Sequence, residues 1–152
     1  MGETNILASE KVAIVGVLDP AASIAAVQYT DVIDMSKWHQ ALGLFLLGNM
    51  SDGDNVVCAA YRCDSAGNNV AAIKTETLTA AAGNDNTQVV IGVRGEDLLP
   101  QTTYNRYIKF GITNGAGGGG VACVVALGVD PVYGPASDHD LASVQSIENA
   151  LD

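Results

Sequence analysis

Apolar and polar residues alternate along much of this chain, in short stretches separated by turn-forming residues. Residues 104–113 alternate apolar with polar or small side chains, and residues 121–129 form a nearly continuous apolar run. A period of two predicts β-strands, and the continuous run indicates deeper burial. Asn114 and Gly115 lie between the two segments and are typical of a tight turn. We therefore predict a hairpin whose second strand is the more deeply buried.

Further strands are expected where short apolar stretches meet turn residues. Residues 36–48 fit either a helix or a buried strand, and their glycines and the turn that follows favour a strand. Residues 70–82, rich in Ala and Thr, fit a short helix or an edge strand. The other expected elements are strands at 11–18, ended by Asp19-Pro20; at 24–30, extending toward Ile33; at 55–63, which opens a second hairpin; and at 88–94, followed by a short turn or helical corner at 96–100.

These elements predict an all-β fold class, a single-domain antiparallel β-sandwich of about seven strands with N- and C-terminal arms. The 152 residues have the size of one domain. After Pro135 the alternation ends, and Leu141, Val144 and Ile147 follow one another at three-residue steps. We expect an N-terminal arm at 1–10, the sandwich domain at 11–135, and a C-terminal arm or short helix at 136–152.

Composition and charge exclude several classes of partner. Aromatic residues make up only 5% of the chain, so the core must be built mainly from aliphatic side chains. The formal net charge is −10, and the seven basic side chains are scattered, so we expect no direct binding of nucleic acid. The same charge repels an anionic membrane surface, and no segment has the length of a membrane span.

The three cysteines, Cys58, Cys63 and Cys123, match neither an even disulfide set nor a metal-binding spacing. We expect buried thiols. Cys58 and Cys63 are five residues apart and therefore point to opposite faces of a regular strand, which argues against a bridge between them.

Asp34, Ser36 and His39 carry the side chains of a catalytic triad, but they lie within six residues of one another. A triad is normally brought together by the fold from distant parts of the chain. We expect a turn aspartate, a capping serine and a partly exposed imidazole, and no catalytic residue.

Three other segments have the composition of ligand sites. His139 stands between two aspartates, residues 52–55 carry oxygen ligands around a glycine, and residues 115–120 are almost all glycine. The first fits a solvated tail, the second a hairpin turn without the rest of a calcium loop, and the third a loop without a phosphate-binding Lys. We expect no metal site and no cofactor.

Three segments in the last two-thirds of the chain carry a resemblance to a known family. They are residues 89–98, ending in Val-Arg-Gly-Glu-Asp-Leu; residues 128–138, Gly-Val-Asp-Pro-Val-Tyr-Gly-Pro-Ala-Ser-Asp; and residues 141–144, Leu-Ala-Ser-Val. They resemble small structural proteins of tailed-bacteriophage head modules, whose pattern includes Val-Arg-Ala-Glu-Glu-Leu and Asp-Pro-Arg-Tyr-Gly-Pro-Ala. Val132 stands where that family commonly has a basic residue, so no ionic contact is expected there.

The resemblance implies a capsid-associated protein, and the short chain favours an accessory subunit over a major shell protein. We expect a decoration (cement) protein that is made in the host cytoplasm and binds the major capsid protein on the outer surface of the virion. Self-association as a dimer or trimer would give avidity. We expect the contacts to come from apolar residues, mostly in the arms: Ile6, Leu7, Trp38, Tyr133, Pro135, Leu141, Val144 and Ile147.

Several alternatives stay open at this point. In the first, the apolar residues of the arms fold back onto their own sandwich. Another virion part, such as a head-completion, connector or tail protein, fits the same resemblance. A small hydrolase using Ser36 and His39 is the remote alternative. A carbohydrate-binding sandwich has little support, because one Trp and five Tyr offer few stacking platforms.

Overall fold

The protein is a two-layer β-sandwich in the computed structural model, which describes residues 7–21, 26–50, 53, 55–68, 70–79, 86–99, 106–114, 120–133, 139–140, 142–144 and 146–147. Within these ranges there is one short helix, one turn of 3-10 helix and nine strands. The elements are α1 (Ala8–Lys11), β1 (Val12–Ala21), β2 (Gln28–Tyr29), β3 (Ile33–Asp34), β4 (Trp38–Met50), β5 (Asn55–Cys63), β6 (Ala71–Thr79), β7 (Gln88–Arg94), η1 (Gly95–Leu98), β8 (Tyr107–Asn114) and β9 (Gly120–Pro131).

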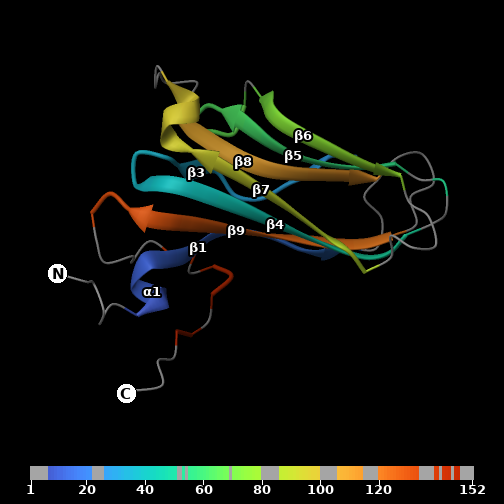
Figure 1. Ribbon diagram of the computed structural model, residues 1–152, viewed down its shortest axis with the longest axis horizontal. Coiled ribbons are helices and arrows are strands. Elements are labelled where there is room, and N and C mark those ends of the chain that lie inside the picture. Colours follow the sequence, from blue (N-terminus) through green and yellow to red (C-terminus); the bar gives the residue numbers. More distant parts are fainter. Residues whose placement is uncertain are drawn as a thin grey trace.

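The strands form two antiparallel sheets that pack face to face (Figure 1). Sheet A has the order β1-β9-β4-β7, and sheet B has the order β2-β8-β5-β6, with β3 also paired to β8. All paired strands are antiparallel. The predicted all-β sandwich is therefore confirmed. Seven of the strands have seven residues or more, and β2 and β3 have two each.

The core lies between the inward faces of β4 and β9 in sheet A and of β5 and β8 in sheet B. Phe45 and Phe110 meet edge to face at its centre, with ring centroids 6.1 Å apart. Glycine is needed opposite the largest side chains, because a Cβ at Gly43 would overlap the Phe110 ring and a Cβ at Gly128 would overlap the Trp38 indole. The Phe110 ring is thus accommodated by a glycine on the facing sheet, and the Trp38 indole by a glycine on the neighbouring strand of its own sheet.

Several local predictions are confirmed. The ambiguous segment at 36–48 is strand β4, and the Ala- and Thr-rich segment is the edge strand β6, which forms a hairpin with β5. The turn of that hairpin is built by Asp64, whose Oδ1 accepts hydrogen bonds from the backbone N–H groups of Ala66 and Asn68. The helical corner is η1.

The predicted hairpin of residues 104–113 and 121–129 is wrong. β8 pairs with β5, β2 and β3 in sheet B, whereas β9 pairs with β1 and β4 in sheet A. The connection therefore crosses from one sheet to the other, a distance of about 10 Å that a two-residue turn does not span. The hairpin turn predicted at 52–55 is also wrong, because the strands that it would join, β4 and β5, lie in different sheets.

The prediction that the second of these strands is the more deeply buried is also wrong. β8 is buried along most of its length, because its outward side is covered as well: a Cβ at Gly111 would overlap the rings of Tyr29 and Tyr61, and Lys109 is only 7% exposed. β9 instead alternates between buried and half-buried residues. Its inner side faces the core and its outer side does not.

Strand β1 does not end at Asp19-Pro20 but continues to Ala21. The pairing with β9 is irregular between Leu18 and Ala21, and β1 is the edge strand of sheet A, where the missing N–H of Pro20 costs no ladder hydrogen bond. Other groups bond to its free edge. Asp140 N donates to Ile14 O at 2.7 Å, and Ile14 N donates to His139 Nδ1 at 3.3 Å.

The remaining expectations concern the segments on either side of these strands. In the segment expected to form a strand at 24–30, only Gln28 and Tyr29 are paired among the described residues, and the extension to Ile33 is a separate short strand, β3. The described residues after 138 contain a turn at Ala142 and Ser143 and no helix. The expected limits of the N-terminal arm, sandwich domain and C-terminal arm stay predictions.

Candidate functional site

The outer face of sheet A is lined with apolar side chains. Residues of β4 alternate between the core and the outside, so that Phe45 is fully buried while Leu42, Leu44 and Leu46 point outward. In an ordinary antiparallel sandwich the outward positions are polar. Three leucines in succession on this side therefore set the sheet apart.

The same pattern continues across the neighbouring strands. β9 places Cys123, Val125 and Leu127 directly opposite the three leucines of β4, and β7 places Val90 opposite Leu44. At the other edge, β1 adds Ile14 and Val17, paired with β9. We call this surface the apolar face; its residues are Ile14, Val17, Leu42, Leu44, Leu46, Val90, Val121, Cys123, Val125, Leu127 and Val129.

Solvent reaches the apolar face most at Leu46, Val121 and Val90, which are 41%, 46% and 59% exposed. No charged residue stands at the outward positions of β4 from Gln40 to Gly48 or of β9 from Val121 to Val129. The nearest charges stand at the margins of the sheet, in the flanking strands. The face therefore offers apolar contact with little cost of removing charges from water.

The outer face of sheet B is different. Thr75 and Thr77 of β6 stand opposite Ala59 and Val57 of β5, and all β6 positions from 74 to 77 are exposed. Lys109 also lies on this side, with its Nζ donating to Gly67 O at 2.7 Å and sitting 3.7 Å from the centre of the Tyr29 ring. The outer face of sheet B is thus more polar, and the outer face of sheet A is mainly apolar.

Sequence reasoning missed this face, although the signal was present in the apolar runs of β4 and β9. Continuous apolar runs mark strands that are buried on both sides. The run at 121–129 therefore predicts a strand that is buried inside the sandwich, and not one that has a side on the surface. The structure places one side of it in the core and the other on the surface, where a second covering layer is absent among the described residues.

The three cysteines are free thiols. Cys58 and Cys63 are fully buried, as expected, and Cys123 is half-buried on the apolar face. Burial and the charge of Glu76 raise the pKa of Cys58 to about 12. Burial, and to a lesser degree Asp19, also raises the pKa of Cys123. None of the three has the lowered pKa of a reactive cysteine.

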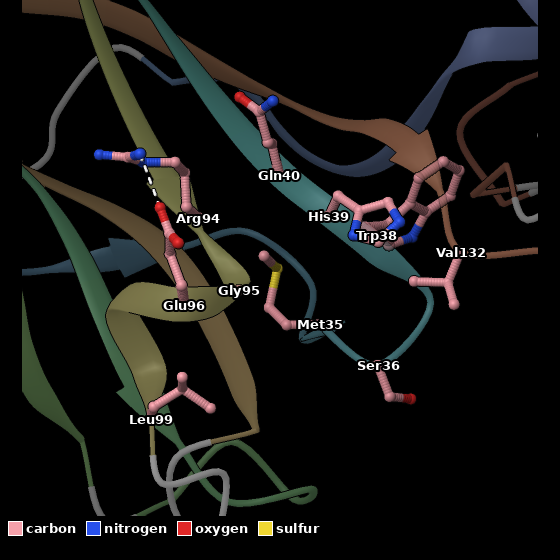
Figure 2. A pocket seen from close by; sticks show the side chains of 10 residues that line it. All are labelled: Met35, Ser36, Trp38, His39, Gln40, Arg94, Gly95, Glu96, Leu99 and Val132. Atoms are coloured by element: carbon pink, nitrogen blue, oxygen red, sulfur yellow. Dashed lines mark ion pairs between the residues drawn. The ribbon is translucent and has the colours of Figure 1, made fainter.

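A cleft of about 530 Å³ lies at one end of the sandwich, beside η1 (Figure 2). Its one internal ion pair joins Arg94 Nη1 to Glu96 Oε1 at 2.6 Å, and both side chains are about two-thirds exposed. A pair so open to water contributes little to binding or stability. The lining residues are Met35, Ser36, Trp38, His39, Gln40, Arg94, Gly95, Glu96, Leu99 and Val132.

The residues considered as a triad are near this cleft but are not arranged as one. Asp34 accepts hydrogen bonds from Arg106 Nε at 2.7 Å and from the backbone N–H of Ser36 at 3.0 Å. Partial burial raises the pKa of Asp34, but the bonds from Arg106 and Ser36 outweigh it and lower the pKa to about 2. Figure 2 shows the Ser36 hydroxyl pointing away from the His39 ring. Asp34 therefore serves a turn and an ion pair.

The segment around His139 is also structural. Its Nδ1 accepts the N–H of Ile14, and the Asp140 carboxylate accepts the N–H of Ala142 at 3.2 Å. Asp138 lies outside the described residues. Within the ranges that the structure describes, no three His, Cys, Asp or Glu side chains come together as metal ligands.

None of the helices among the described residues is long and apolar enough to cross a bilayer.

The predicted contact residues fall into three groups. Leu7, Ile147 and Tyr133 are exposed, at 38%, 44% and 85%, and Val144 is half-buried. Trp38 is buried at the base of the cleft, where it packs on Gly128. The rest lie outside the described residues: Ile6, Pro135 and Leu141.

No protein-family model matches the chain, and no curated protein matches it in sequence. Among solved structures, it is similar to a chain from "Bacillus endospore appendages form a novel family of disulfide-linked pili", with 13% identity, a TM-score of 0.43, and coverage of 84% of this chain and 98% of that one. It is also similar to VP2 of the infectious bursal disease virus subviral particle, with 13% identity, a TM-score of 0.46, and coverage of 79% and 32%. A structure of the Gt strain of that virus gives 13% identity, a TM-score of 0.41, and coverage of 79% and 33%.

The chain spans about a third of the length of the two viral chains. At this level of identity and overlap, a similarity describes strand arrangement and carries no conclusion about function.

Proposed function

We propose that this protein is a structural subunit that acts by docking on other proteins, and specifically a decoration (cement) protein of a tailed-bacteriophage head. The observation that carries the proposal is the apolar face, an uncharged surface on a chain of net charge −10. Such a protein stays soluble through the charge on its other surfaces and associates where charge is missing.

The mechanism is burial of surface, repeated over many copies. Each subunit needs only a modest contact with the shell, since a self-associated subunit that touches the major capsid protein at several points gains avidity. The exposed apolar residues Leu7, Tyr133 and Ile147 are the proposed contacts with the shell. The protein would then lie on the outer surface of the virion, and we propose no catalytic role for it.

The test is to mix the purified protein with expanded, undecorated capsids and to image the particles. Density at regular lattice positions is the expected result. The Tyr133→Ala variant should bind at least about tenfold more weakly, because Tyr133 is 85% exposed and its ring has little other contact to lose. Val70→Ala is the matched control, since Val70 is also exposed but precedes β6 of sheet B. Absence of binding by the wild type at native salt would remove the proposal.

Another virion role, as a connector, head-completion or tail protein, follows from the same resemblance. It differs in copy number, because a decoration protein occupies the whole lattice while a connector forms one ring of about six or twelve subunits. Quantitative mass spectrometry of intact particles separates the two roles.

A further inference from the structure

We propose that the apolar face is the contact between two copies of this chain, packed sheet A against sheet A about a two-fold axis. This inference rests on the proposed function in one respect only: it supplies the self-association through which a decoration subunit gains avidity. A two-fold contact uses the same surface on both copies, so it requires a face that is complementary to itself. A flat sheet of aliphatic side chains without charge meets that requirement.

The size of the apolar face suits such a contact. Four strands spaced about 4.8 Å apart, with about 3.3 Å per residue from Val121 to Val129, cover about 400–500 Å² of sheet plane per copy. A contact over this whole area would lie close to the lower end of specific interfaces, roughly 600 Å² per partner. Two such sheets pack about 10 Å apart, the same spacing as the two layers of the sandwich itself.

Charge favours a second copy over an unlike partner of opposite charge. A chain of net charge −10 would recruit a basic partner through its acidic surfaces, but the outward positions of β4 from Gln40 to Gly48 and of β9 from Val121 to Val129 carry no acidic group with which to hold one. Arg94, at the margin of sheet A, is already paired with Glu96. Contact across the face must therefore come from apolar packing, and each copy presents an identical flat surface to the other.

The edge of the same sheet is less available than its face. At the free edge of β1, Ile14 N and Ile14 O are both bonded, to His139 and Asp140. Val17 N points to the Asp31 carboxylate at 3.5 Å. These groups obstruct the addition of another strand beside β1. The described part of the C-terminal segment meets Ile14 at this edge through the His139 side chain and the Asp140 backbone N–H.

The experiment measures the mass of the full chain by sedimentation equilibrium from about 1 to about 200 µM. The expected result is a dimer of about 31 kDa, twice the 15.6 kDa of one chain. Leu44→Lys should weaken the dimer at least about 100-fold, because it buries an unpaired charge at the centre of the contact. Since this change also makes each chain less acidic, weaker association cannot come from greater overall repulsion. Thr77→Lys adds the same charge to the exposed face of sheet B and should leave the dimer intact.

One further variant keeps the test decisive. If Leu44→Lys loses its fold by circular dichroism, Leu44→Thr serves instead, since Leu44 is half-buried in one copy and the hydroxyl is tolerated on a strand surface. The dimer of the Leu44→Thr variant should have a dissociation constant about tenfold higher than that of wild type. A single-chain mass at every concentration would overturn the inference, and so would a dimer, trimer or larger species that Leu44→Lys and Leu44→Thr leave unchanged.

The capsid-binding assay separates this inference from the proposed function. A dimer sensitive to Leu44→Lys that never binds capsids would leave the inference standing and remove the decoration role. A monomer that binds capsids through the apolar face, and loses binding in Leu44→Lys, would overturn the inference and assign the face to the shell. A monomer whose binding is unaffected overturns it as well.

Discussion

Leu44 of β4 lies directly opposite Val125 of β9, and both side chains point away from the core. Their neighbours on the inner side, Phe45 and Val124, are fully buried and also opposite one another. The two inner strands of sheet A therefore carry an apolar pair on each side of the sheet at the same level. That arrangement is typical of a sheet that is covered on both sides in its working state.

The packing of Trp38 on Gly128 makes this glycine sensitive to substitution. A Cβ at position 128 would lie 2.8 Å from Trp38 Cε3 and closer still to other ring atoms. We expect Gly128→Ala to lower the free energy of unfolding by about 2 kcal/mol, measured by urea denaturation. Gly92→Ala is the matched control, because its Cβ would meet only Leu42 Cδ1 at 3.8 Å, and it should stay within about 0.5 kcal/mol of wild type. The two variants must be compared at equal protein concentration. Equal losses of unfolding free energy in Gly128→Ala and Gly92→Ala would contradict the packing of Trp38 on Gly128.

The ion pair of Asp34 and Arg106 predicts a dependence of stability on acid. The pKa of Asp34 is lowered from 3.8 to about 2 in the folded protein, so its contribution is fully present above about pH 4 and is lost as the pH falls through about 2. Because the Arg106 side chain is 43% exposed, we expect a contribution of only about 1 kcal/mol.

Urea denaturation of wild type and Asp34→Asn at a series of pH values measures this contribution. The difference between the two proteins should be largest near neutral pH and should shrink toward about pH 2. Glu96→Gln removes a carboxylate from the exposed pair with Arg94 and serves as the control, with little change at any pH. A constant difference between Asp34→Asn and wild type from neutral pH to about pH 2 would contradict the assignment.

The thiols should differ in reactivity. With its pKa raised to about 12, Cys58 has about one thiolate in 10⁴ at pH 8, and it is fully buried as well. We expect iodoacetamide to modify Cys123 first in the native protein and all three cysteines in denaturant, as followed by peptide mass spectrometry. Cys123 belongs to the apolar face, so its modification should slow further as the protein concentration rises. Modification of Cys58 or Cys63 before Cys123 would contradict the burial described.

His139 should protect one backbone group at the edge of sheet A. Its Nδ1 accepts the Ile14 N–H, which points away from β9 at an irregularity in the pairing of β1. We expect His139→Ala to speed hydrogen exchange of the Ile14 amide about tenfold, measured by NMR, while the Val124 amide in central strand β9 is unchanged. His39→Ala, at the exposed end of β4, is the control and should leave both amides as they are.

The fold class could be predicted because each strand carries its own local signal. The Asp64 turn and the alternation on its two sides predict the β5–β6 hairpin, and the glycines of the segment at 36–48 argue correctly against a helix. The partners of β8 and β9 could not be predicted in this way. A glycine-rich connection can turn back within one sheet or cross to the other sheet. The strands on either side decide between the two by the neighbours they pack against, and those neighbours are distant in sequence.

The candidate site was predictable only in part. Tyr133 is exposed and its contact role stays a prediction, whereas Trp38 is buried in the core. The apolar face depends on pairing β4 with β9, strands about 80 residues apart, so no local pattern reveals that their outward sides merge. The composition of the β4 and β9 runs predicts that both strands are apolar, but not that half of their side chains form one surface on the outside of sheet A.

The last of the described strands is also a central one. β9 lies between β1 and β4, so sheet A is divided into β1 and the β4–β7 pair until residues 120–131 have left the ribosome. At a synthesis rate of about 5–20 residues per second, β1 waits for seconds without a partner in sheet A, and β4 waits with one of its two edges unpaired. The nascent chain is consequently vulnerable to misassociation in the interval before β9 emerges, and a chaperone that binds extended apolar segments would act in that interval.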